Sequence, residues 1–283
     1  MRSRFAPDSR LVRRMLVTIL LLGLLYAAFV AALIAAGVGA AVAAVALAAV
    51  LVTLHLMSDR LVLSAMGARE VTPEQEPELH ALVDRLCALA DLPKPRVAIS
   101  PAAEPNAFAA GHTSRNAALC VTQGLLDRLD QRELEGVLAH EVSHLAHRDV
   151  ALSTAVSVFS TVAGLLSGLA LFLGLGGRRR ALVPLGLLAA LASGVVYLIS
   201  LVLTRALSRY RELAADRGGA LLTQRPSALA SALGKIDAAA ADGPRVTNAL
   251  MFAGQRLPDL LDTHPPIPRR QEQLRWLATE LGS

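Results

Sequence analysis

Two histidines, His140 and His144, flank Glu141 in the segment His-Glu-Val-Ser-His. On a helix, residues four apart lie one turn apart on the same face, so the two imidazoles can bind a single metal ion. Glu141 points about 100° further round the helix, where it can reach a water on the metal without binding the metal itself. This spacing predicts the chemistry of a zinc hydrolase. The alternative is a surface helix that carries two histidines by chance.

The residues around this segment predict an amphipathic helix in water. Apolar residues recur with helical spacing at positions 134, 137, 138, 142 and 145. The histidines therefore lie to one side of the apolar stripe. Asp130 is a candidate N-cap, and Glu133 follows three residues later, as in a capping box. Charged residues surround the motif, so we expect the site to lie beside a membrane and not within the lipid.

A catalytic zinc site takes three protein ligands and leaves a fourth position for water, so a third ligand is needed. His147 lies on the same helix face, but about 10 Å along the axis from His140, too far to share one ion easily. Further along the chain, Glu212 and Asp216 stand one turn apart on an expected helix. We expect Glu212 to bind the metal and Asp216 to orient a ligand imidazole from behind. Without the histidine motif, an exposed helix face would explain this pair of acids better.

Three long stretches contain no Asp, Glu, Lys or Arg: residues 15–58, 150–177 and 181–204. A bilayer is crossed by about 20 apolar residues, so the first stretch is long enough for two helices. A turn is expected at Gly37–Gly39, and the length of this stretch argues against a secretory signal peptide. The sequence predicts four transmembrane helices in two hairpins, over residues 15–36, 40–57, 150–177 and 181–204.

The basic residues predict the orientation in the membrane. Before the first apolar stretch, one acid, Asp8, is outnumbered by five arginines: Arg2, Arg4, Arg10, Arg13 and Arg14. The positive-inside rule places this end in the cytoplasm, and a hairpin returns the chain to the same side. Arg178–Arg180 would then lie on the far side if both later segments cross the bilayer. A shallow or re-entrant second hairpin is the alternative.

The soluble parts predict a domain of helices and short strands. Helices are expected near residues 74–91, 205–222, 226–238 and 267–281, and strands at 96–100 and 117–122. Between the two strands, the segment 104–111 precedes the motif helix. An extended segment there could pair with a peptide substrate by strand addition, and an ordinary loop is an equal alternative.

The composition excludes some classes of function. The net charge of +5 and the pI near 9.8 come almost wholly from arginine, since Lys94 and Lys235 are the only lysines. No basic cluster is interleaved with aromatic residues, so we expect no nucleic-acid partner. Cys87 and Cys120 are too few and too far apart for a disulfide framework, and a cytoplasmic domain would keep them reduced.

Together these features resemble the HtpX-type membrane zinc metalloproteases, relatives of the type I CAAX prenyl proteases. The likeness runs from about Ala65 to the C-terminal helix. It rests on seven segments in this order: Met66–Arg69, Pro105–Ala109, Val121–Leu126, Glu133–Glu141, Arg148–Asp149, Glu212–Asp216 and His264–Pro266. The family implies a mainly α-helical membrane protein, with four transmembrane helices in two hairpins and a cytoplasmic α+β zincin-like metalloprotease domain.

The resemblance also implies the domain organisation. Residues 1–58 would form the N-terminal segment and first hairpin, and residues 150–204 the second hairpin. The zincin-like domain would consist of residues 59–149, with the motif helix, and residues 205–283, with the third zinc ligand.

The resemblance assigns roles to particular residues. It implies one Zn²⁺ per chain on His140, His144 and Glu212, with Glu141 as the catalytic carboxylate and Asp216 behind a ligand. It further implies that the substrate strand is lined by Asn106, Ala107 and Phe108. His264 and Arg270 would approach the site, where His264 would stabilise the oxyanion.

The function implied is that of a zinc endopeptidase in the bacterial inner membrane, with its catalytic domain facing the cytoplasm. Its partners would be the lipid bilayer and polypeptide substrates, namely membrane proteins or unfolded segments handled in quality control. A prenyl-protein protease would share the zinc residues but need a membrane-enclosed chamber. A zinc-binding scaffold without activity would lack a working Glu141, and a channel or transporter would leave both motifs unexplained.

Overall fold

The site-bearing part of the chain is a small mixed sheet covered by helices. In the computed structural model, the described residues are 66–110, 117–147, 183–242 and 265–282, with a few residues between 13 and 64. The chain divides into two units, and they are treated separately below. One comprises residues 1–11, 57–151 and 209–283, and the other residues 12–56 and 152–208.

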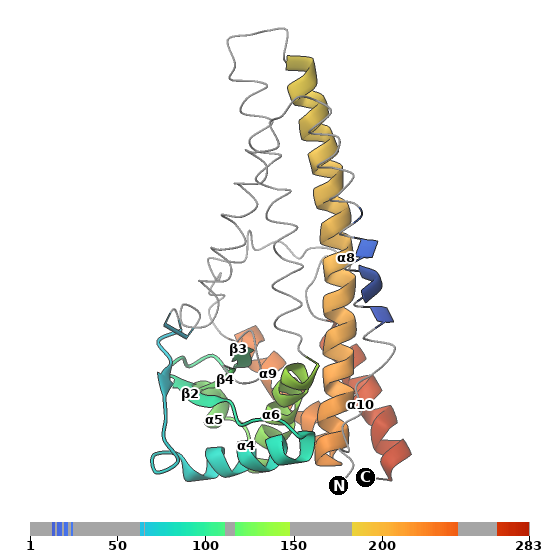
Figure 1. The fold of residues 1–283 in the computed structure, drawn as a ribbon. Helices are drawn as coiled ribbons and strands as arrows, with labels where there is room; N and C mark the ends of the chain where they lie inside the picture. Colours follow the sequence, from blue (N-terminus) through green and yellow to red (C-terminus); the bar gives the residue numbers. More distant parts are fainter. Residues whose placement is uncertain are drawn as a thin grey trace. The chain divides into compact units, whose positions relative to one another are not determined.

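Four strands form the sheet of the first unit (Figure 1), namely β1 Arg69–Glu70, β2 Arg96–Ser100, β3 Ala107–Ala110 and β4 Ala118–Thr122. Their order is β1-β2-β4-β3, with β2 and β4 parallel and the other two pairs antiparallel. The two expected strands are confirmed as β2 and β4. The segment between them contains strand β3, which lies at the edge of the sheet.

Within the described ranges, the helices with defined bounds are α4 Pro77–Ala90, α5 Gln123–Leu126, α6 Gln131–Ala146, α8 Val183–Thr223, α9 Pro226–Asp242 and α10 Ile267–Leu281. Helix α4 begins later than the expected residue 74, because the Thr72 carbonyl accepts the N–H groups of Gln75 and Glu76 in a turn. Pro77 then starts the helix, where proline lacks only an N–H that the helix does not use.

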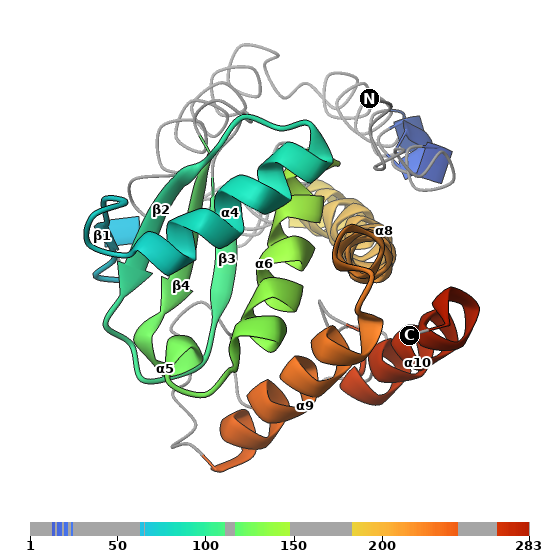
Figure 2. The same ribbon diagram turned by 90° about the horizontal axis from the view of Figure 1, so that it is seen from below.

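The central strand β4 is buried on both faces, since all five of its residues are buried. On one face Leu119 and Val121 join the main core, which α4, α6, α9 and α10 complete with Leu86, Leu138, Leu229 and Leu274. On the other face Ala118 and Cys120 pack with Leu63 and Ala98. Figure 2 shows α4 lying across the sheet and α6 running beside β3, which brings the motif helix next to the sheet edge.

The start of α6 is fixed by the expected capping box. The Asp130 side chain accepts the N–H groups of Arg132 and Glu133 at 2.8 and 2.9 Å. In return, the Glu133 carboxylate accepts the N–H of Asp130 at 3.0 Å. Because this cap sets where the helix begins, it also sets which face carries the histidines.

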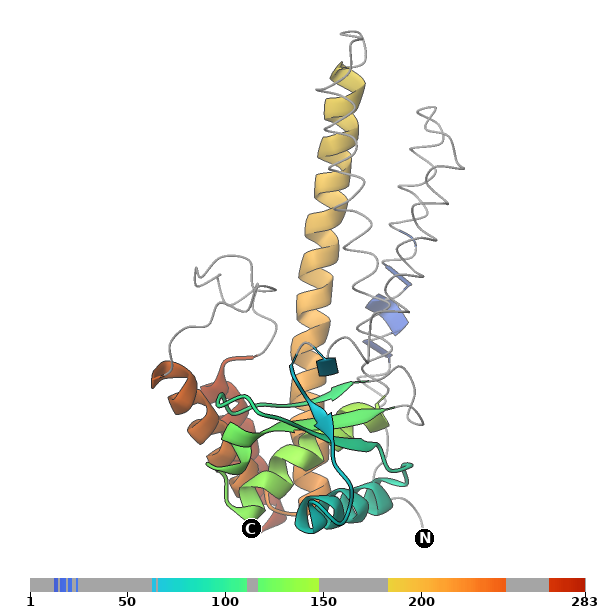
Figure 3. The ribbon, with the colours of Figure 1, turned by 90° about the vertical axis from the view of Figure 1, so that its left-hand side faces the viewer.

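The apolar stretches are described only in part. The segments 15–36, 40–57 and 150–177 lie almost entirely outside the described residues. The fourth, residues 181–204, falls mostly within α8, where it joins the expected helix at 205–222 as one continuous helix (Figure 3). Within the part of the chain that is described, no helix has both the length and the hydropathy needed to cross a membrane.

Candidate metal centre

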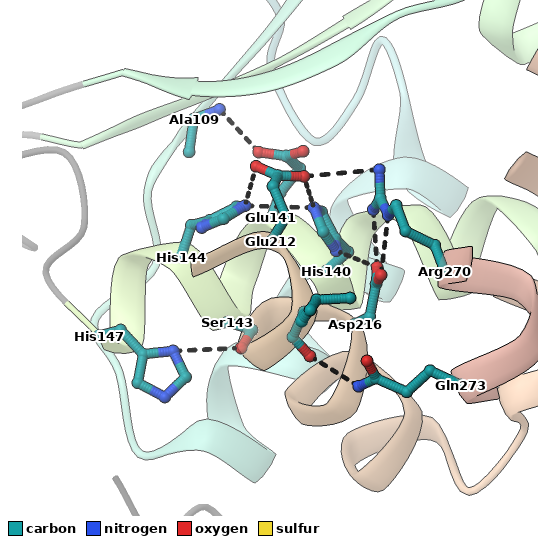
Figure 4. A network of polar contacts seen from close by, with 11 residues as sticks. Ala109, His140, Glu141, Ser143, His144, His147, Glu212, Asp216, Arg270 and Gln273 are labelled. Atoms are coloured by element: carbon teal, nitrogen blue, oxygen red, sulfur yellow. Dashed lines mark hydrogen bonds and ion pairs between the residues drawn. The ribbon is translucent and has the colours of Figure 1, made fainter. Parts of the chain in front are cut away.

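Helices α6 and α8 bring three potential metal ligands together. The Nε2 atoms of His140 and His144 lie 3.1 Å apart, one turn from each other on α6. The Glu212 carboxylate of α8 lies across from them, with Oε2 3.6 Å from the His140 Nε2 and Oε1 3.5 Å from the His144 Nε2 (Figure 4). All three side chains are buried, and among the described residues they are the group of donors that could hold a metal ion.

The spacing of these donor atoms fits zinc. Ligand atoms at 2.0–2.1 Å from a tetrahedral zinc lie about 3.3 Å from one another. The three separations found here, 3.1, 3.5 and 3.6 Å, lie close to this value. Two imidazoles and one carboxylate are also a ligand set of catalytic zinc sites, where the fourth position stays open.

Asp216 holds the far side of the His140 ring. It lies one turn after Glu212 on α8, is fully buried, and places Oδ1 2.9 Å from the Nδ1 of His140. A carboxylate on Nδ1 keeps the proton there and leaves the Nε2 lone pair for a metal. This is the position that the sequence predicts for Asp216.

Arg270 of α10 completes the buried network. Its guanidinium donates to both oxygens of Asp216, at 2.8 and 2.6 Å, and its Nη1 lies 3.4 Å from Oε2 of Glu212. Burial raises the pKa of Asp216, but the hydrogen bonds from Arg270 and His140 outweigh burial and lower it. Asp216 is therefore an anion at neutral pH, as its contact with the His140 ring requires.

The anionic surroundings of His140 favour a cation at its ring. Burial lowers the pKa of His140, but hydrogen bonds with Asp216 and Glu212 reverse this effect and raise it to about 10. A proton and a metal compete for the same nitrogen. The charges that attract a proton to this ring therefore also attract a divalent cation.

Glu141 faces the edge of the sheet. Its Oε2 accepts the backbone N–H of Ala109 in β3 at 3.0 Å (Figure 4). Burial raises the pKa of Glu141, against the opposing effect of the two histidines and the Ala109 hydrogen bond. A carboxylate with a raised pKa is closer to the pH at which it can both take and return a proton.

The predicted substrate segment lies on β3, beside Glu141. Asn106 is tied to β4, because its N–H donates to Oγ1 of Thr122 at 2.8 Å and its carbonyl accepts the Thr122 N–H at 2.9 Å. In an antiparallel pair, only every second residue of a strand hydrogen-bonds to the neighbouring strand. The N–H of Ala109 in β3 points away from β4 toward Glu141. By this alternation the N–H of Ala107 also faces away from the sheet. Phe108 packs instead with the small core around Cys120.

The sequence argues against His147 as a ligand, and the family resemblance implies His264 at the oxyanion. His147 is the C-cap of α6, with its Nδ1 3.4 Å from Oγ of Ser143, and it is not part of the donor group. His264 lies outside the described residues. No residue pattern indicates the Ala109 N–H, since a backbone donor has no residue type to recognise, and none indicates the pairing of Arg270 with Asp216.

The two cysteines are not part of the donor group. Cys87 and Cys120 are free and buried, and burial raises the pKa of each thiol to about 11. A thiol with such a pKa carries almost no thiolate at neutral pH, so neither residue is a suitable nucleophile.

Comparison with known proteins agrees with this geometry. The model of peptidase family M48 matches residues 73–278. Protease HtpX homolog 1 of Streptomyces coelicolor is 49% identical over 296 residues, which cover 100% of this chain and 97% of the relative. The protease HtpX homolog of Moorella thermoacetica is 46% identical over 295 residues, with 99% of each chain covered. The chain belongs to peptidase family M48.

As an M48 peptidase the chain is a metalloprotease, and the resemblance inferred from its sequence motifs is confirmed. Its fold is also similar to that of S. mikatae Ste24p, with a TM-score of 0.52 and 15% identity. That likeness covers 94% of this chain and 66% of Ste24p, and at this identity it concerns the fold alone.

Proposed function

We propose that this M48 peptidase is a zinc endopeptidase in which His140, His144 and Glu212 hold one zinc ion per chain. The observation that carries the proposal is the convergence of three buried donors at the spacing of a tetrahedral site. Zinc bound there would polarise the scissile carbonyl and lower the pKa of its water to about 7.

In this proposal Glu141 moves the proton. Its carboxylate takes a proton from the attacking water and then delivers it to the leaving amine. The Ala109 N–H orients the carboxylate, and burial raises its pKa toward the range that this exchange needs. The stabilisation of the oxyanion by His264 remains a prediction for a residue outside those described.

Asp216 and Arg270 orient the ligands in the same proposal. Asp216 keeps the Nδ1 proton of His140 in place, so that Nε2 presents its lone pair. Arg270 compensates the charge of the two α8 carboxylates, because it contacts both of them. The guanidinium of Arg270 is buried against these two acids. A direct contact between Arg270 and the substrate remains a prediction.

We propose that polypeptide substrates add a strand to β3 over Asn106, Ala107 and Phe108. The outward N–H of Ala107 on this edge strand is a donor that such pairing requires, and the next outward N–H, that of Ala109, binds Glu141. A peptide paired there would run past the carboxylate that handles the proton.

We further propose that the chain spans the bacterial inner membrane with two hairpins, one within the N-terminal part, residues 1–58, and one at residues 150–204. The two parts of the catalytic domain, residues 59–149 and 205–283, would then face the cytoplasm. Support comes from the three uncharged stretches and from large apolar side chains that are exposed along α8: Leu191, Val195, Leu198, Ile199 and Val202. Lipid tails are as apolar as these side chains, so a bilayer would cover them. Substrates would then be membrane proteins or unfolded segments removed in quality control.

The metal and the base can be tested together on the full chain purified in detergent. Casein hydrolysis should need zinc and stop with a chelator, and Glu141→Gln should keep about one zinc per chain while hydrolysis falls about 10²–10⁴-fold. Glu212→Ala should lose zinc and hydrolysis together. Hydrolysis by Glu141→Gln at the wild-type rate would refute the proposed mechanism. Cleavage of a prenylated CAAX peptide in preference to casein would favour the prenyl-protein protease instead.

Topology needs a separate test. Single cysteines introduced at Ala103 and Ala240 lie on either side of the second proposed hairpin. A membrane-impermeant maleimide should label both from the cytoplasmic side in inverted vesicles. Labelling from opposite sides would contradict the two-hairpin arrangement.

A further inference from the structure

Helix α8 meets the backbone of α6 at Gly219. A Cβ atom on Gly219 would lie 2.9 Å from the backbone N of His140. It would also lie 3.1 Å from the Cα of His140 and from the carbonyl carbon of Ala139. Real Cβ atoms essentially never approach another atom within 3.0 Å, and these neighbours are backbone atoms, which cannot rotate away.

Gly219 lies on the same face of α8 as the two acids of the site. It follows Glu212 by seven residues and Asp216 by three, which is the spacing of one helix face. All three positions contact His140. Glu212 lies near Nε2 of the ring, Asp216 near Nδ1, and Gly219 against the backbone.

We infer that Gly219 is a positioning residue for the metal centre. Its missing side chain sets the separation of α6 and α8 at which both acids reach the His140 ring. This inference rests on the proposed zinc function. A methyl group at position 219 must push the two helices apart by a few tenths of an ångström, and metal–ligand distances tolerate only about 0.2 Å.

Two other helical glycines provide matched controls. A Cβ on Gly136 of α6 would lie 3.1 Å from the backbone N of Leu229, so this residue also permits a close helix contact, but against α9. A Cβ on Gly234 of α9 would lie 3.0 Å from the side-chain Nε2 of Gln271, which can move aside. All three substitutions by alanine raise helix propensity equally. They differ in what the new methyl group displaces.

The test compares Gly219→Ala, Gly136→Ala and Gly234→Ala in the full chain. Zinc affinity is measured by competition with a chromogenic chelator, and the unfolding midpoint is measured on metal-free protein. Gly219→Ala should weaken zinc binding about 10–100-fold, as loss of a group that orients a ligand does. Gly136→Ala should lower the unfolding midpoint but keep the wild-type zinc affinity, and Gly234→Ala should change neither strongly.

The outcomes separate this inference from the proposed function. If the wild type binds no zinc, the proposed function fails. If the wild type binds zinc and Gly219→Ala binds it equally well, only the positioning role is overturned. The role is also overturned if Gly219→Ala does not fold while Gly136→Ala does, because the contact would then serve the fold and not the site. Equal losses of zinc affinity in Gly219→Ala and Gly136→Ala would have the same meaning.

Discussion

The two ends of helix α6 both bury charge, but they neutralise it differently. Near the N-terminal end, Glu133 and Glu135 are buried, and their cationic partners reach into water. Lys235 lies 2.6 Å from Glu133 with its side chain 46% exposed, and Arg85 lies 2.7 Å from Glu135 with its side chain 53% exposed. Near the C-terminal end, His140 and His144 face acids that are as buried as they are, and Arg270 is buried too.

The exposure of the cationic partners therefore distinguishes an end of α6 that stabilises the fold from an end that forms the site. At the N-terminal end each acid gains a partner without the full desolvation of that partner, so the pairs tie α6 to α9 and α4 at modest cost. At the C-terminal end every charge depends on its neighbours, and removing one leaves another uncompensated in the interior. A fold does not need such an arrangement, whereas a site that binds a cation does.

The largest difference between the two ends of α6 is expected at Asp216. Asp216→Asn removes the negative charge behind His140 and leaves Arg270 with one acid fewer, so zinc affinity should fall about 10–100-fold. Glu135→Gln is the control at the other end of α6, and it should leave zinc affinity unchanged. Chelator competition on both variants checks this. Equal affinities for Asp216→Asn and the wild type would remove Asp216 from the site.

The next largest effect concerns Ala109. Proline is tolerated on an edge strand where the N–H faces away from the sheet, so Ala109→Pro deletes the hydrogen bond to Glu141 without breaking the ladder. The kcat of Ala109→Pro should fall about tenfold, because the Glu141 carboxylate loses the hydrogen bond that orients it. Ala107→Pro removes an outward N–H that does not reach Glu141, so it should raise KM but leave kcat unchanged. Peptide-hydrolysis kinetics showing the same kcat for both variants would speak against the role of Ala109.

A smaller effect, on stability alone, is expected at Glu133. Burial raises the pKa of Glu133, but hydrogen bonds from Lys235, the Asp130 backbone and Ser231 together lower it below its ordinary value of 4.5. The ionised group therefore stabilises the fold above about pH 4.5, and this contribution is lost as the pH falls through the lowered pKa. Glu133→Gln should lower the free energy of unfolding by about 1 kcal/mol at pH 7, since water screens Lys235.

Denaturant titrations at several pH values check this prediction. The difference between Glu133→Gln and the wild type should shrink as the solution becomes more acidic. A difference that stays constant down to pH 3 would show that the charge of Glu133 is not what stabilises this end of α6.

The smallest effect is expected at His147. This residue caps α6 one turn beyond the donor group and contacts Ser143. His147→Ala should keep zinc content and hydrolysis within about twofold of the wild type, as substitutions away from a site usually do. Loss of zinc by this variant, measured by metal analysis, would mean that the ligand set is assigned wrongly.

The sequence predicted the features of the site that depend on local spacing. The helical repeat places His140 and His144 on one face, and the capping box at Asp130 fixes where α6 begins. The sequence also predicts Glu212 and Asp216 at the site, and the family resemblance brings Arg270 near them, but two particular contacts between residues far apart in the chain are not predicted. Arg270 meets Asp216 across 54 positions, and the Ala109 N–H meets Glu141 across 32. Neither contact leaves a periodic pattern, because each depends on how separate elements pack.

The helix boundaries show the same limit. The spacing of its apolar residues predicts α4, but the helix begins later than predicted, because a turn at Thr72 precedes Pro77. Residues 181–204 and 205–222 were expected as two helices on grounds of composition. The change in composition at residue 205 does not interrupt the backbone hydrogen bonds, so the structure has one helix, α8.

The most direct test of the central claim is the zinc-induced shift in the unfolding midpoint. It is measured on the wild type, Glu212→Gln and Glu133→Gln, each with and without zinc. Zinc at about 1,000 times its Kd stabilises a folded site by about 4 kcal/mol. The wild type and Glu133→Gln should show the same shift, although Glu133→Gln starts from a lower midpoint, and Glu212→Gln should show almost none. A full shift in Glu212→Gln, or its loss in Glu133→Gln, would contradict the division of α6 into a stabilising end and a metal-binding end.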